Sequence, residues 1–337
     1  MMTTIEGQNN VVDDFSTGQR LDLYLFNTGK FESRSASAKA ITNGGVLVNG
    51  SVVKKNYCLK QGDILTFVEH DQNIDVAEEP IPLDIRFEDE HIVVVSKQAD
   101  LLTHPSNEAQ KRTLMHALIQ RYGEQGLCMC QGNEARPGIV HRLDAFTTGL
   151  MVCAKTNEAG NALIEQIKNR EVDRRYVALV HGIIKDNTIK IDAPIRRHTT
   201  HRTKMVVGDG AGAKTAITTA EKIKTYSSTN NDAGYTLLEC KLLTGRTHQI
   251  RIHMQFIKHP VVGDPLYDSY SPKAKSSSLG LTRQFLHSAK LSFSHPITGE
   301  TLHFEDNLPE DLKGALAQLD ARVLEETELK EQYQELL

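Results

Sequence analysis

Two short motifs in the middle of the chain carry the side chains most suited to chemistry. The first reads RPGIVHRLD over residues 136–144 and is followed by TTGL over 147–150. Its Asp144 carboxylate, flanked by His141 and Arg142, lies on a turn that leads into an apolar segment, and such supported loops often hold functional groups. A carboxylate there can act as a nucleophile or stabilise positive charge. A structural ion pair between Asp144 and a nearby Arg explains the same pattern.

The second motif reads LTGRTHQIRIH over residues 243–253. Thr247 can cap a helix in which Ile250, Met254 and Ile257 recur at helical spacing and face the core. Arg251 lies beside that apolar stripe, so its guanidinium should emerge at a buried edge and need a carboxylate. We expect Asp144 to be that partner, because the pairing would keep the carboxylate ionised and orient its oxygens. The alternative is a purely structural Arg251.

A third group of basic residues lies between these motifs. Its spacing suits contacts with backbone phosphates, although an ordinary mobile surface loop has the same composition. The group consists of Arg196, Arg197, His198, His201, Arg202 and Lys204.

The elements that must position these residues follow from apolar runs and periodicity. A helix is expected at 112–121 and another at 157–169, with strands at 92–95, 150–154, 176–180, 215–223, 235–242 and 285–293. Many strands and few long helices indicate an α+β domain around a large mixed, mainly antiparallel sheet.

A separate small unit precedes this domain. Short helices near Arg20 and after Ser33 lead to a strand at 46–48, a tight turn at Asn49 and Gly50, and a strand at 64–68. Residues 20–22 (RLD), 33–34, 39, 45–50 (GVLVNG) and 62–63 resemble an S4 RNA-binding domain, with its αL-type fold. The resemblance implies phosphate contacts by Arg34, Lys39 and Lys54, helped by Lys55. Solvated surface charges on a small α+β module are the alternative.

The length of 337 residues suits two domains, with room for large cores. We expect a flexible tail at 1–14, the small unit at 15–70, and an acidic, proline-bearing linker at 71–83. The large domain should span 84–310, followed by an acidic helical segment at 311–337.

Charge is distributed unevenly along the chain. The net charge is −4, yet residues 136–260 hold 20 Lys and Arg against 11 Asp and Glu, a local net charge of +9. Residues 301–337 hold 3 against 10, a local net charge of −7. This asymmetry indicates a basic binding face and an acidic tail, although uneven surface charge without a partner gives the same numbers.

Five scattered cysteines show no disulfide framework and no zinc spacing, so we expect ordinary thiols, including Cys128 and Cys130. The absence of a long apolar run and of a signal peptide predicts a cytoplasmic protein without a membrane anchor. We expect it to be a monomer.

The two central motifs together resemble the RluA/RluD family of pseudouridine synthases. Matching runs occur in the family's order at 175–180 (RYVALV), 263–267 (GDPLY), 286–289 (LHSA) and 295–296, and the resemblance covers about residues 80–305. It implies a pseudouridine synthase catalytic domain in which Asp144 is the essential aspartate, supported by Arg251. It also implies that Tyr176 packs on a flipped uracil and that Arg142 fills the vacated space or contacts RNA.

The resemblance further implies a redox-neutral isomerisation without metal or organic cofactor, acting on RNA, and large-subunit ribosomal RNA in particular. Two departures from the family pattern stand out. Ala145 and Phe146 replace a basic and an acidic residue after the aspartate, and Arg174 replaces a lysine two residues before Tyr176.

Two other function classes remain in view. One is a non-catalytic RNA-binding or ribosome-assembly factor dominated by the S4 unit. The other is a glycoside hydrolase, which would need a second carboxylate within about 5–10 Å of Asp144.

Overall fold

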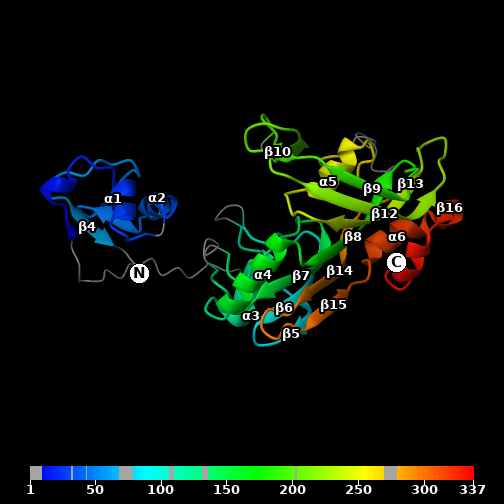
Figure 1. The fold of residues 1–337 in the computed structure, drawn as a ribbon, viewed down its shortest axis with the longest axis horizontal. Helices are drawn as coiled ribbons and strands as arrows, with labels where there is room; N and C mark the ends of the chain where they lie inside the picture. Colours follow the sequence, from blue (N-terminus) through cyan, green and yellow to red (C-terminus); the bar gives the residue numbers. More distant parts are fainter. Residues whose placement is uncertain are drawn as a thin grey trace. The chain divides into compact units, whose positions relative to one another are not determined.

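The computed structural model describes residues 10–31, 33–42, 44–67, 79–105, 110–130, 136–201, 203–268 and 279–337. The chain divides into two compact units, Met1–Ile74 and Asp75–Leu337 (Figure 1). Each unit has its own apolar core, and each is described by itself below.

The first unit packs two short helices on a four-stranded sheet of order β1-β4-β2-β3. Its core gathers Leu21 and Leu25 of the first helix, Ile41 of the second, and Val46 and Leu65 of the strands. Asn49 and Gly50 turn the chain between β2 and β3 with φ of 52° and 76°, a backbone that asparagine and glycine tolerate best. The elements are β1 (Asn10–Val11), α1 (Leu21–Asn27), α2 (Arg34–Thr42), β2 (Val46–Val48), β3 (Ser51–Val52) and β4 (Ile64–Phe67).

The second unit is built on a ten-stranded sheet of order β16-β12-β13-β8-β14-β7-β6-β5, with β15 paired to β14 and β9 paired to β12. The β7–β14 pair is parallel and the other strand pairs of this sheet are antiparallel, so the expected mixed, mainly antiparallel α+β fold is confirmed. Its strands are β5 (Asp84–Glu88), β6 (Ile92–Lys97), β7 (Thr148–Ala154), β8 (Asp173–His181), β9 (Thr188–Asp192), β12 (Ile217–Tyr226), β13 (Tyr235–Leu242), β14 (Leu286–Ser294), β15 (Thr301–Glu305) and β16 (Val323–Glu326).

Helices cover this sheet, and a two-stranded hairpin stands beside it. In Figure 1, α3 and α4 lie against the β5–β7 half, and α5 lies near β12 and the hairpin. Thr156 caps α4 by accepting a hydrogen bond from the Ala159 amide, and Ala159 and Leu163 then pack on the β7 core. The elements are α3 (Leu114–Tyr122), α4 (Asn157–Asn169), α5 (Gln249–Phe256) and α6 (Glu310–Ala317), with hairpin strands β10 (Ile195–Arg197) and β11 (Met205–Val207).

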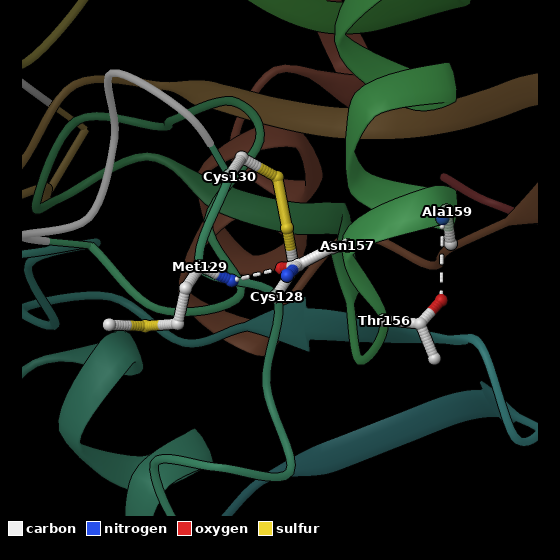
Figure 2. Close-up of a disulfide and its surroundings, with 6 residues drawn as sticks. All are labelled: Cys128, Met129, Cys130, Thr156, Asn157 and Ala159. Carbon is white, nitrogen blue, oxygen red and sulfur yellow. Dashed lines mark hydrogen bonds between the residues drawn. A yellow bond between two sulfur atoms is a disulfide. The ribbon is translucent and has the colours of Figure 1, made fainter. Parts of the chain in front are cut away.

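Cys128 and Cys130 form a disulfide, so the expectation that they are ordinary thiols is wrong (Figure 2). Their Cα atoms are 5.5 Å apart, within the range that a disulfide spans. Both are buried against α4. A Cβ on Gly160 would lie 2.2 Å from the Cys128 sulfur, so only glycine leaves room for the disulfide at this position. The Met129 amide between them donates to the Asn157 side chain at 2.7 Å, which fixes the turn. The sequence did not predict this bond, because two cysteines separated by a single residue do not form a recognisable disulfide framework.

Both ends of the chain differ from the expected segments. Asn10 and Val11 pair with β4, so part of the expected 1–14 tail belongs to the first unit, and residues 1–9 lie outside the described residues. In the C-terminal segment, expected to be helical, only α6 is an α-helix. Val323–Glu326 instead forms β16 on the edge of β12, and the Tyr333 hydroxyl donates to Glu239 of β13. These contacts join segments that lie far apart in the sequence, so no local periodicity could predict them.

No helix in the described ranges is long and apolar enough to cross a membrane.

Candidate active site

Asp144 lies on the loop that enters β7, at an open cleft. Arg142, Tyr176, Arg246, His248 and Arg251 also line the cleft. The sheet order explains why these residues lie close together. Strands β7 and β8 both pair with β14, and the loop after β13 leads into α5. The structure therefore brings together Asp144, Tyr176, Arg251 and Arg142, which the sequence analysis singled out.

Arg251 donates from Nη1 to Asp144 Oδ2 at 2.9 Å, so the predicted pairing is present. Asp144 keeps 16% of its side chain exposed while Arg251 keeps 4%. The carboxylate thus has one oxygen held and an open side toward the cleft. Such a charge-assisted contact orients the carboxylate.

Asp264 lies in the GDPLY run at 263–267, for which the sequence indicated no role. It fixes the orientation of the Arg251 guanidinium. Its two oxygens accept from Arg251 Nε at 2.6 Å and Nη2 at 2.8 Å, and its side chain is fully buried. Burial alone would lower the pKa of Arg251, but the contacts with Asp264 and Asp144 outweigh it and raise that pKa. Arg251 is therefore a permanent cation with a fixed orientation.

The start of α5 differs from the expected Thr247 cap. His248 is the N-cap residue with a left-handed backbone (φ 57°) and makes no side-chain cap bond. Gln249 takes over the stabilising contacts, because its Oε1 accepts from the Arg246 amide at 3.0 Å and the Thr244 hydroxyl at 2.7 Å. The buried stripe through Ile250 and Met254 is as expected.

His248 is a cleft residue that the sequence analysis did not assign. Its Nδ1 is 2.8 Å from the Tyr267 hydroxyl, which accepts from the Met205 amide at 2.9 Å. When Tyr267 donates its own hydrogen to Nδ1, the remaining imidazole proton sits on Nε2, 3.9 Å from Asp144 Oδ1. Burial lowers the pKa of His248 despite the opposing charge of Asp144, so the ring is neutral at pH 7.

The loop that carries Asp144 is held through its main chain. Lys97 Nζ donates to the Ala145 carbonyl at 2.9 Å, and Arg283 Nη1 donates to the Phe146 carbonyl at 3.0 Å. The Thr103 hydroxyl donates to the Leu143 carbonyl at 2.8 Å. Burial lowers the pKa of Lys97 to about 7, with Asp144 acting in the opposite direction. Three side chains thus fix the position of the carboxylate.

Tyr176 lies on β8 with its ring at the cleft and only 4% of the residue exposed. Burial raises the pKa of its hydroxyl, with Arg174 acting in the opposite direction. Arg142 is exposed at the cleft, where its Nη1 donates to His104 Nε2 at 3.2 Å. An aromatic ring and an exposed cation therefore line the cleft together with the carboxylate.

The residues that are predicted to contact phosphates lie in both units. In the second, Arg197 is exposed on β10, Lys204 lies on the turn before β11, and Arg202 falls outside the described residues. In the first, Arg34 donates to Asp22 at 3.1 Å, Lys54 is exposed, and the side chain of Lys39 also falls outside the description. Within the described ranges, no cluster of three or more His, Cys, Asp or Glu side chains could hold a metal ion.

Comparisons with known proteins show which families the chain resembles. Residues 91–256 match a family model described as RNA pseudouridylate synthase, and residues 19–65 match one described as S4 domain. An uncharacterized RNA pseudouridine synthase, YlyB, of Bacillus subtilis (strain 168) is 39% identical over 297 residues, which are 87% of this chain and 92% of that protein. The ribosomal large subunit pseudouridine synthase D of Xanthomonas campestris pv. campestris is 37% identical over 92% of this chain and 91% of its own length.

A solved structure is also similar. Human RNA pseudouridylate synthase domain containing 1 aligns with a TM-score of 0.55 at 25% identity, over 77% of this chain and 97% of the human chain.

Proposed function

The chain belongs to the RNA pseudouridylate synthase family, and we propose that it isomerises specific uridines of large-subunit ribosomal RNA with Asp144 as its catalytic carboxylate. One observation carries the assignment of Asp144. Its carboxylate faces an open cleft while Arg251, fixed by the buried Asp264, holds one of its oxygens.

The reaction changes four bonds. The N1–C1′ glycosidic bond breaks, the uracil turns, and C5 bonds to C1′. The C5 proton then leaves, and N1 gains a proton. No net oxidation occurs. Asp144 can serve by adding to C1′, by adding to C6 of the uracil, or by removing a ribose proton on a glycal route, and all three need an ionised carboxylate next to the nucleoside. The Arg251 contact fixes the orientation of this carboxylate at the cleft.

The target base must leave its stack to reach Asp144. Unstacking costs a few kcal/mol and is cheapest in loops and bulges. We assign Tyr176 to packing on the flipped uracil, because its ring borders the cleft beside Asp144. Arg142 is assigned to the space that the base leaves, because it is exposed and has no carboxylate partner among the described residues.

The choice of RNA is supported by relatives and by charge. Several relatives are named ribosomal large subunit pseudouridine synthase D. The matched S4 domain, with Arg34, Lys39 and Lys54, and the hairpin residues Arg197, Arg202 and Lys204 would bind phosphates. We also propose that the chain works in the cytoplasm and as a monomer. Light scattering coupled to gel filtration tests the monomer.

A hydrolytic alternative has less support. The other carboxylate on Arg251 belongs to Asp264, which is fully buried and binds the guanidinium with both oxygens. It cannot serve as the general acid that glycoside hydrolysis needs. No specific contact favours a non-catalytic binding factor over the synthase.

Tritium release from ribosomal RNA labelled at uracil C5 tests the proposal, because the isomerisation expels that hydrogen. The wild type should release tritium, and Asp144→Asn should lower the rate by at least about a thousandfold while RNA binding persists. Asp186→Asn, which neutralises an exposed carboxylate, is the matched control. A wild type that releases no tritium from large-subunit RNA contradicts the assigned reaction, and full activity of Asp144→Asn contradicts the role of Asp144.

A further inference from the structure

Arg174 is a buried cation that lacks a carboxylate partner among the described residues. It lies on β8 with 6% of the residue exposed, and its Nε is out of contact with solvent and makes no hydrogen bond. Its neighbour Arg175 differs completely, because Arg175 donates to Asp173 at 3.0 Å and to Glu239 at 2.7 Å. Two adjacent arginines on one strand thus have opposite environments.

A second donor without an acceptor belongs to His141. Its Nε2 accepts from the Val152 amide at 3.1 Å, so a neutral ring carries its proton on Nδ1, which is buried and has no partner in the described part of the chain. Burial and then the charge of Arg174 lower the pKa of His141 to about 3, which keeps the ring neutral. Each of these two buried donors lacks an acceptor among the described residues.

Arg174 borders the active-site cleft. Arg174 and Tyr176 are two residues apart on β8 and so face the same side of the sheet. The charge of Arg174 also acts on the Tyr176 hydroxyl. Gly245 lies over the guanidinium, since a Cβ built on it would be 3.3 Å from Arg174 Nη1. Because Gly245 has no side chain, no side chain from this position covers Nη1. The next residue, Arg246, lines the cleft.

An unpaired buried guanidinium reduces the stability of the folded protein, because its charge has lost water without gaining a carboxylate. The missing partner must be an anion with two acceptor oxygens, since the guanidinium presents a planar fork of donors. A phosphodiester of RNA has that geometry and arrives whenever the cleft binds its substrate.

We propose that Arg174 binds the backbone phosphate adjacent to the flipped uridine, entering over Gly245. This assignment rests on the proposed function, because it requires RNA in the cleft. The flipped nucleotide would then be held at two points. Its base would pack on Tyr176, and its phosphate would bind Arg174, two residues earlier on β8.

The test compares variants of the full chain on a transcript of large-subunit ribosomal RNA. Arg174→Met removes the charge at similar volume, and Arg174→Lys keeps the charge. Lys190→Gln removes an exposed positive charge on β9 as the matched control. The dissociation constant is measured against KCl concentration, together with tritium release and the melting temperature. The first unit is unchanged in every variant, so its share of the salt dependence cancels.

Arg174→Met should weaken RNA binding by about tenfold and reduce the slope of log Kd against log salt by about 0.7–0.9, the value of one phosphate contact. Arg174→Lys should keep the slope, and Lys190→Gln should keep both values. The melting temperature of Arg174→Met should be unchanged or higher, because an unpaired buried charge is removed. An unchanged slope for Arg174→Met overturns the phosphate assignment, whatever the affinity. A wild type that binds RNA without tritium release overturns the proposed function instead, and the slope still decides on Arg174.

Discussion

The ammonium group of Lys97 donates to the main-chain carbonyl of Ala145 at 2.9 Å, one residue beyond Asp144. Lys97 ends β6, is 1% exposed, and also donates to the carbonyls of Gln98 and Leu101 at 2.9 and 2.8 Å. A buried cation thus spans the space behind the catalytic loop and satisfies three carbonyls at once.

Removing this ammonium should slow the reaction without weakening RNA binding. In Lys97→Met the Ala145 carbonyl loses its donor, and a displacement of Asp144 by about 1 Å is enough to lower kcat by about a hundredfold. Single-turnover tritium release and RNA titration separate the two effects. A comparable loss of RNA affinity would place Lys97 in binding rather than in positioning.

The same side chain should make stability depend on pH above neutrality. The pKa of Lys97 is lowered from 10.5 to about 7, so the folded protein binds fewer protons than the unfolded chain between those values. Stability therefore rises with pH in that window, by about 1 kcal/mol between pH 7 and pH 8. Urea unfolding at both pH values measures it. The free energy of unfolding of Lys97→Met should not rise between pH 7 and pH 8. If the variant shows the same rise as the wild type, other groups cause it.

Asp264→Asn tests whether Arg251 depends on its buried partner. The amide offers one neutral oxygen in place of two charged ones, so the free energy of unfolding should fall by about 2–3 kcal/mol. Arg251 would also lose its fixed orientation toward Asp144, and tritium release should fall by at least about tenfold. Asp186→Asn, exposed and distant in sequence, should leave both measurements unchanged. Retained activity with lost stability would limit Asp264 to a structural role.

The ring of Tyr176, rather than its hydroxyl, should matter for activity. Tyr176→Phe keeps the ring at the cleft and should retain tritium release within about threefold, whereas Tyr176→Leu removes the stacking surface, worth about 1–3 kcal/mol per base, and should lose tenfold or more. Melting curves show whether both variants fold. Equal activity of the two variants would argue against packing on the uracil.

The Cys128–Cys130 disulfide should protect two of the five thiols from alkylation. Unfolded, unreduced protein should take up three labels, on Cys58, Cys153 and Cys240, and reduction should raise the count to five. The bond closes a very short loop, so reduction should cost the folded state only about 1.5–2 kcal/mol. Mass spectrometry counts the labels; five labels without reductant would show that the bond does not form in solution.

Periodicity and motif order predicted much of this molecule. The strand at 235–242 and the helix at 157–169 match β13 and α4 residue for residue, because their apolar faces repeat locally. The Asp144–Arg251 contact also followed from sequence, since a charged residue beside a buried stripe needs a partner.

The residues that support this pair could not be found in the same way. Lys97 lies 47 residues before Asp144 and reads as the polar end of an apolar strand, and Asp264 reads as part of a turn. Both act through contacts that exist only once the sheet and α5 are assembled. The position of β16 depends likewise on pairing with a strand about a hundred residues earlier.

The loop that carries Asp144 is held through the carbonyls of Leu143, Ala145 and Phe146, groups that every amino acid has. Substitutions at 145 and 146 therefore leave the supporting contacts of Asp144 intact. Phe146, 38% exposed next to the cleft, shows how far these side chains can depart from the charged pair of the family. The side chains at 145 and 146 are therefore free to vary in evolution, while the main-chain contacts that hold Asp144 in place are kept.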